Sequence, residues 1–136
     1  MSSDNRGRRR VVVTGVGLVS PLGIGTEPSW AGALAGRSGI APITLFDAAA
    51  YSTRFAGEVK GFDPLQWIEK KEVKKCGRFI QFAIAASEMA VAASELKVTP
   101  ANATRVGVLI GSGIGGFEVI EREHRTLLER GPDRVS

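Results

Sequence analysis

The sequence predicts an α/β fold, because stretches with the composition of buried strands alternate with stretches that favour helices. Residues 10–14 and 105–110 are short apolar runs rich in β-branched side chains, and each run leads into a glycine-rich segment. Between them, residues 79–93 contain good helix formers and no glycine or proline. The predicted order is strand, helix, helix, strand, helix, which is typical of α/β domains.

A short helix is expected after the first glycine-rich turn. Thr26 can cap this helix, Pro28 suits its first turn and Gly36 supplies the stop. Residues 37–64 are predicted to be mostly irregular, with one possible short strand at residues 55–59.

The segment from Arg78 to Leu96 is predicted to be a central core helix. Its apolar residues surround the helix almost completely, and its many alanines permit close approach of neighbouring backbone. In a soluble protein such a helix normally lies between other layers of structure.

The last predicted helix runs from about Phe117 to Arg130 and ends at Gly131-Pro132. Its polar face is expected to pair Glu118 with Arg122 and Glu121 with Arg125, at the favourable i, i+4 spacing. Its opposite face carries an apolar stripe, formed by Phe117, Ile120, His124, Leu127 and Leu128. His124 is therefore expected to be a packed structural residue.

Composition favours one globular domain without metal or disulfides. The 136 residues are 43% hydrophobic and 24% charged, and no apolar run approaches the length of a membrane span or a secretory signal core. A cytoplasmic protein is therefore expected. One cysteine and one histidine exclude an internal disulfide and make a protein-only metal site unexpected.

The net charge of +4 comes mainly from two clusters. Residues 1–9 form a basic tail, which with Arg10 includes four arginines and is expected to be a solvated terminus. The second cluster, beside Glu69 and Glu72, is expected on one helix face that can bind an acidic partner; it comprises Lys70, Lys71, Lys74, Lys75 and Arg78. Nucleic acid is not favoured as that partner, because no aromatic side chains are interleaved with the cations.

The most informative loop is Gly111-Ser112-Gly113-Ile114-Gly115-Gly116, in which four of six residues lack a side chain. Such a loop predicts that a ligand or another segment approaches the backbone closely. It formally matches the dinucleotide fingerprint G-x-G-x-x-G, but the acidic residue expected about 20 positions later has no clear counterpart. A scaffold or interaction module, with glycines serving only packing, is the other alternative.

Several blocks in one order give the chain a resemblance to a known family. They include residues 9–17 with Ser20-Pro21-Leu22-Gly23, residues 34–40, Arg78-Phe79-Ile80-Gln81-Phe82-Ala83, and residues 102–116. The chain closely resembles the N-terminal part of β-ketoacyl-acyl-carrier-protein synthases, most of all type II of fatty acid synthesis. Polyketide-type ketosynthases share these opening motifs and remain an alternative.

The resemblance implies the N-terminal part of a thiolase-like αβαβα sandwich over residues 10–136, incomplete in this chain. The family catalyses decarboxylative Claisen condensation and usually forms homodimers. Family members carry their cysteine nucleophile, two catalytic histidines and a supporting lysine in later segments. The chain alone is therefore expected to be inactive and prone to association, with Cys76 as a bystander thiol and no catalytic residue present.

The resemblance also implies two functional positions and a partner. Ile114 matches the family residue at the mouth of the acyl-chain pocket. Lys71, Lys74 and Lys75 match basic positions that help dock the acidic acyl carrier protein. No cofactor, metal, nucleic acid or membrane is expected to take part.

Overall fold

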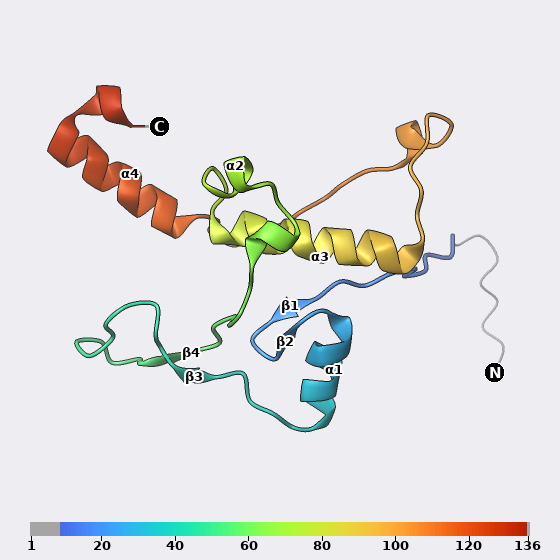
Figure 1. Cartoon of the computed structure of the whole chain (residues 1–136), viewed down its shortest axis with the longest axis horizontal. Helices are drawn as coiled ribbons and strands as arrows, with labels where there is room; N and C mark the ends of the chain where they lie inside the picture. The colour runs from blue at the N-terminus through green and yellow to red at the C-terminus, as the bar shows by residue number, and fades with distance from the viewer. Residues whose placement is uncertain (1–8, 136) are drawn as a thin grey trace.

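The longest helix, α3 (Arg78–Ser94), crosses the middle of the molecule, and the other elements are arranged around it (Figure 1). The structure is a computed structural model and describes residues 9–135. Most of the basic tail, with Arg6 and Arg8, lies outside the described residues. The central helix predicted from Arg78 to Leu96 is confirmed. Its last residue is Ser94, and the C-cap residue Glu95 has the left-handed conformation with φ of 55°.

A small hairpin and a helix lie on one side of α3. Strands β1 (Val19–Ser20) and β2 (Gly23–Ile24) pair antiparallel, and α1 (Thr26–Leu34) follows directly. The hydroxyl of buried Ser29 joins these elements, since it lies 2.9 Å from the Ser20 hydroxyl and donates to the Gly23 carbonyl at 3.0 Å. The hairpin therefore fixes the start of α1.

The boundaries of α1 are close to those predicted, but its cap differs. Gly25 occupies the N-cap position, and the Thr26 hydroxyl donates instead to the Val16 carbonyl at 2.9 Å. The prediction that Thr26 caps the helix was therefore wrong. Gly36 follows the helix with φ of +63°, a conformation that a side chain would strain, and so it ends the helix as predicted.

A second antiparallel pair organises the irregular segment after α1. Strand β3 (Ala41–Pro42) pairs with β4 (Phe55–Ala56), which is shorter than the strand predicted there. Beyond this pair, the Glu58 carboxylate accepts hydrogen bonds from the Thr44 hydroxyl at 2.6 Å and from the backbone N–H groups of Thr44 and Leu45 at 2.9 and 3.1 Å. These bonds close a loop of exposed chain.

Two further α-helices complete the regular structure, together with short 3₁₀ turns at Pro64–Gln66, Ala103–Arg105 and Pro132–Arg134. Helix α2 (Lys70–Val73) is a single turn that precedes α3. Helix α4 (Phe117–Arg130) has the predicted boundaries and extends away from the other elements (Figure 1).

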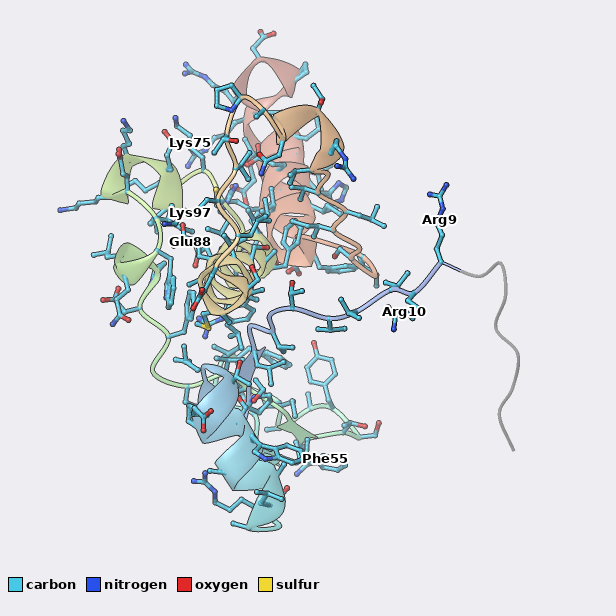
Figure 2. The ribbon with its side chains drawn as sticks, turned by 90° about the vertical axis from the view of Figure 1, so that its right-hand side faces the viewer. Arg9, Arg10, Phe55, Lys75, Glu88 and Lys97 are labelled. Atoms are coloured by element: carbon cyan, nitrogen blue, oxygen red, sulfur yellow. The ribbon has the colours of Figure 1, made fainter. Side chains whose placement is uncertain are left out.

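The two strands predicted at residues 10–14 and 105–110 do not form. Both segments lie outside regular strands; Val11 is 92% exposed and Leu109 is 99% exposed. Figure 2 shows Arg9 and Arg10 on an extended stretch that leads away from the helices. A β-branched run becomes a strand only when a neighbouring strand accepts its backbone hydrogen bonds, and the described residues supply none to either run.

Close packing is concentrated where residues 15–17 cross α3. A β-carbon added to Gly17 would clash with the Ala86 carbonyl oxygen, and one added to Gly15 would clash with that of Ala90. The absence of a side chain at Gly15 and Gly17 permits this approach. Burial of α3 is otherwise only partial: among its residues Ala85 alone is buried, at 0% exposure, so the expected burial on all sides is not observed.

Helix α4 differs from its prediction in its contacts. The apolar stripe is present, but Phe117, Ile120 and Leu128 are exposed. His124 is exposed as well, so the prediction that it is a packed structural residue was wrong. Among the described residues, neither of the predicted i, i+4 ion pairs of α4 forms, so that prediction was wrong. The Arg122 Nε instead lies 3.0 Å from a carboxylate oxygen of its neighbour in sequence, Glu123.

Candidate functional site

The glycine loop, residues 111–116, connects an extended segment to the start of α4. Its apolar residue, Ile114, is 73% exposed. Nothing lies within 4 Å of a β-carbon added to Gly111 or Gly113. The expected close approach to the loop backbone is therefore found only at its end, at Gly115 and Gly116.

The side chain that approaches this end is Phe79, from the first turn of α3. Its ring lies 3.0 Å from a β-carbon added to Gly116 and 3.5 Å from one added to Gly115. Sequence reasoning did not single out Phe79 as part of the site. The only available signal was the pair of adjacent glycines, which indicates a bulky neighbour but does not identify it.

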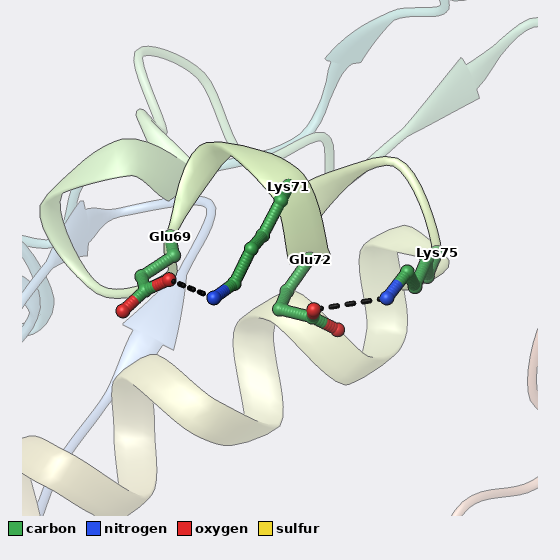
Figure 3. A network of polar contacts seen from close by, with 4 residues as sticks. All are labelled: Glu69, Lys71, Glu72 and Lys75. Carbon is green, nitrogen blue, oxygen red and sulfur yellow. Dashed lines mark hydrogen bonds and ion pairs between the residues drawn. The ribbon is translucent and has the colours of Figure 1, made fainter.

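The predicted basic cluster lies on α2 and just beyond it. Lys71 pairs with Glu69, and Lys75 with Glu72, each at 2.9 Å (Figure 3). Lys74 makes no ion pair within the described part of the chain. All three lysines are exposed, so the two carboxylates offset only part of a positive surface that remains open to an approaching partner.

A glutamine from α3 fixes the orientation of this cluster. The Gln81 amide donates to the carbonyls of Cys76 and Val73, at 2.9 and 3.3 Å. These bonds hold the C-terminal end of α2 against α3. The exposed lysines therefore stand on a turn that is tied to the central helix.

A hollow of about 310 Å³ lies between α2, α3 and α4. Its lining includes Lys74, Lys75, Arg78, Cys76, Glu118 and Arg122. The structure thus adds Arg122, which is distant in sequence, to the predicted basic cluster. The Arg78 guanidinium is committed elsewhere: it donates to the Val59 carbonyl at 2.7 Å and lies 5.0 Å from the centre of the Phe82 ring.

A second hollow, of about 290 Å³, is mostly apolar and adjoins the end of the glycine loop. Lys75 borders both hollows, while Phe79 and Gly116 line the second. The basic cluster and the C-terminal end of the glycine loop are therefore neighbours. Ile114 lines neither hollow, so these contacts do not bring it together with the lysines.

The remaining candidate side chains, Cys76 and His124, lie on different segments. Cys76 is half-buried at the first hollow, whereas His124 is exposed on α4. No three potential metal ligands gather among residues 9–135. Over the same residues, no helix combines the length and apolar character that crossing a membrane requires.

Known proteins are similar to this chain in sequence and in fold. The family model described as "Beta-ketoacyl synthase, N-terminal domain" matches residues 8–136. The 3-oxoacyl-[acyl-carrier-protein] synthase 2 of Vibrio cholerae is 54% identical over 129 residues, which cover 95% of this chain and 31% of that protein. The corresponding synthase of Synechocystis is 46% identical, with 97% of this chain and 32% of that protein covered.

Two solved structures of similar proteins match the fold of this chain. The ishigamide ketosynthase/chain length factor superposes with a TM-score of 0.75 at 35% identity, covering 95% of this chain and 32% of that one. A β-ketoacyl synthase from Burkholderia phymatum gives a TM-score of 0.71 at 32% identity, covering 93% and 31%.

These matches confirm the predicted resemblance and the fold class, part of a thiolase-like α/β sandwich. The chain spans about a third of the length of the curated relatives it matches. The chain belongs to the β-ketoacyl synthase family and matches an N-terminal portion of its members.

Proposed function

We propose that this chain is the N-terminal portion of a 3-oxoacyl-acyl-carrier-protein synthase that elongates fatty acyl chains. In that reaction an acyl group passes from a carrier-protein thioester to a cysteine thiolate. Malonyl carrier protein then loses carbon dioxide, and the resulting carbanion attacks the acyl thioester and expels the thiolate. The observation that carries the proposal is 54% identity to a synthase of this type over 95% of the chain.

Within that enzyme, Ile114 is proposed to stand at the mouth of the acyl pocket. Its apolar side chain is largely exposed, and the glycines at 111 and 113 leave open space beside the backbone. A side chain in such a position can contact an alkyl chain directly. Its bulk would help to decide which chain lengths enter.

Lys71, Lys74 and Lys75 are proposed to dock the acyl carrier protein. Support comes from their exposure, from the anchoring of α2 by Gln81, and from the additional cation at Arg122. Charges at the rim of an interface accelerate encounter and favour the correct orientation of an acidic partner. Nucleic acid forms no part of this proposal.

The chain by itself is proposed to be inactive. It contains one cysteine and one histidine, which is too few for the cysteine and two histidines of the family mechanism. The complete enzyme is proposed to be a homodimer. A cytoplasmic location is also part of the proposal, because the enzyme and its carrier protein must share one compartment.

The function can be tested in a synthase chimera, in which this sequence replaces the matching 129 residues of the Vibrio cholerae relative. Carbon dioxide release from malonyl carrier protein should occur with the chimera and not with the isolated chain. A folded chimera without condensation activity would contradict the proposal.

Docking can be tested by changing Lys71, Lys74 and Lys75 to glutamate in the chimera. We expect carrier-protein affinity at low salt to fall by about tenfold or more, with a smaller difference at high salt. The matched control changes the exposed cations Lys60, Lys97 and Arg105 to glutamate. Equal weakening by both sets would refute a specific docking role.

A polyketide-type ketosynthase is the second candidate, because the ishigamide ketosynthase/chain length factor superposes over 95% of the chain. The products distinguish the two. A fatty acid enzyme adds one two-carbon unit and waits for reduction, whereas a polyketide-type enzyme condenses repeatedly on unreduced intermediates. Mass analysis of the carrier-bound products formed by the complete synthase of which this chain is proposed to be a portion separates these outcomes.

A further inference from the structure

One aromatic ring from another element lies against the C-terminal end of the glycine loop. Phe79 is the second residue of α3, and its ring occupies the space where side chains at Gly115 and Gly116 would otherwise lie, 3.5 and 3.0 Å from β-carbons added there. Gly115 has φ of +82°, a conformation that side chains rarely adopt. The turn that directs the chain from Ile114 into α4 therefore rests on this ring.

The rest of the loop lacks comparable support. Nothing lies within 4 Å of a β-carbon added at Gly111 or Gly113, and Ile114 is largely exposed. Glycine-rich backbone has many accessible conformations, so a loop with one supported end is directed mainly by the contact at that end. The position of Ile114 relative to α3 is therefore set largely where Phe79 meets Gly115.

A second contact holds the same two helices together. The Glu118 carboxylate, in the first turn of α4, accepts a hydrogen bond from the backbone N–H of Arg78, the residue before Phe79. The ring and the carboxylate thus connect the first turn of α3 to the end of the loop and the start of α4. Phe79 therefore lies beside a second contact between the same two helices.

We propose that Phe79 is a positioning residue that holds Ile114 in place and thereby tunes acyl-chain selectivity. The inference rests on the proposed role of Ile114 at the acyl pocket. Phe79 acts through the loop backbone and does not itself touch the acyl chain. Loss of the ring would release Gly115 and Gly116, and Ile114 would then sample positions that restrict long and short chains differently.

The first test uses the synthase chimera with Phe79→Leu and Phe79→Ala. The control is Phe82→Leu, one turn along α3, whose ring packs on Phe62 and not on the glycine loop. We expect Phe79→Ala to change the ratio of kcat/KM for long and short acyl donors by about tenfold, with a smaller change for Phe79→Leu. If Phe79 had only a structural role, its substitution would lower kcat/KM for long and for short acyl donors equally, and the ratio of the two would not change.

The second test does not depend on activity. Amide hydrogen exchange of this chain is followed at Phe117 and Val119, whose N–H groups donate to the carbonyls of Gly115 and Gly116 at 3.1 and 3.0 Å. Phe79→Ala should accelerate it by about tenfold, whereas Phe82→Leu should not. Unchanged exchange in Phe79→Ala would overturn the inference.

Ile114→Phe in the chimera separates the inference from the function on which it rests. If Ile114→Phe leaves selectivity unchanged, the proposed role of Ile114 fails. If Ile114→Phe alters selectivity and Phe79→Ala does not, the role of Ile114 stands and the positioning role of Phe79 is refuted.

Discussion

Glu118 caps a helix that begins forty residues earlier in the sequence. Its Oε1 lies 3.2 Å from the backbone nitrogen of Arg78, the first residue of α3. The first N–H groups of a helix have no carbonyl partner within it, and the N-cap residue here, Gly77, has no side chain to offer. A carboxylate from α4 therefore provides what the local sequence lacks, and its negative charge suits a helix N-terminus.

Removing this distant cap should weaken the junction between α3 and α4. We expect Glu118→Ala to accelerate hydrogen exchange at Arg78 and to cost about 0.5 to 1 kcal/mol, because the bond is exposed to water. Exchange measured by NMR on the chain would show the effect. Glu121→Ala, one turn further along α4, is the control, and equal acceleration there would contradict capping by Glu118.

The loop closed by Glu58 should depend on pH. The Thr44 hydroxyl, followed by the backbone N–H groups of Thr44 and Leu45, holds the pKa of the Glu58 carboxyl below its usual range. A lowered pKa means that the stabilisation is present above the unfolded-state pKa and is lost as pH falls through the folded-state pKa. The protection of the Thr44 amide, measured as its exchange rate relative to the intrinsic rate at the same pH, should therefore be lost as pH falls through the folded-state pKa of Glu58. In Glu58→Gln that acid-induced loss of protection should disappear; its persistence would exclude Glu58 as the cause.

The two unpaired apolar runs should make the isolated chain associate. Val11 and Leu109 are almost fully exposed and lie in extended segments whose backbone groups can pair with another chain. Sedimentation velocity should show larger species as concentration rises, and Leu109→Lys should reduce them. Val98→Lys, at an exposed position outside both runs, should have little effect. A monomer at every concentration would contradict this expectation.

Gly17 should tolerate no side chain. A β-carbon there would clash with the Ala86 carbonyl and lie 2.7 Å from the Met89 β-carbon. We expect Gly17→Ala to destabilise the synthase chimera by about 1 to 3 kcal/mol, measured from its urea unfolding. Gly107→Ala, where no atom lies within 4 Å, should cost less. Similar costs at both positions would show that the contact with α3 is unimportant.

Local signals were enough to predict the helices. Residues 78–94 and 117–130 have helix-forming composition and clear ends, and both helices form as predicted. The runs at 10–14 and 105–110 have strand composition but no partner among residues 9–135. A strand depends on hydrogen bonds to residues far along the chain, so composition alone does not determine whether it forms.

The residues of the candidate site also fall into those that the sequence could predict and those that it could not. The glycine loop and the lysines were recognisable because each is a continuous stretch of sequence. Phe79, Glu118 and Arg122 were not, because each acquires its role from a neighbour that the fold brings close. The predicted Glu118–Arg122 pair assumed that partners lie on the same helix, but Glu118 bonds to α3 instead.

The crossing of residues 15–17 over α3 constrains how this domain can be recombined with its relatives. The backbone at Gly15 and Gly17 lies directly against the carbonyls of Ala86 and Ala90 in α3, so the two segments form one inherited unit although about seventy positions separate them. A crossover between two homologous genes that falls between these segments would combine a first segment from one parent with an α3 from the other, and these two surfaces did not evolve in contact with each other. Viable hybrids should therefore have crossovers before the first segment or after the second.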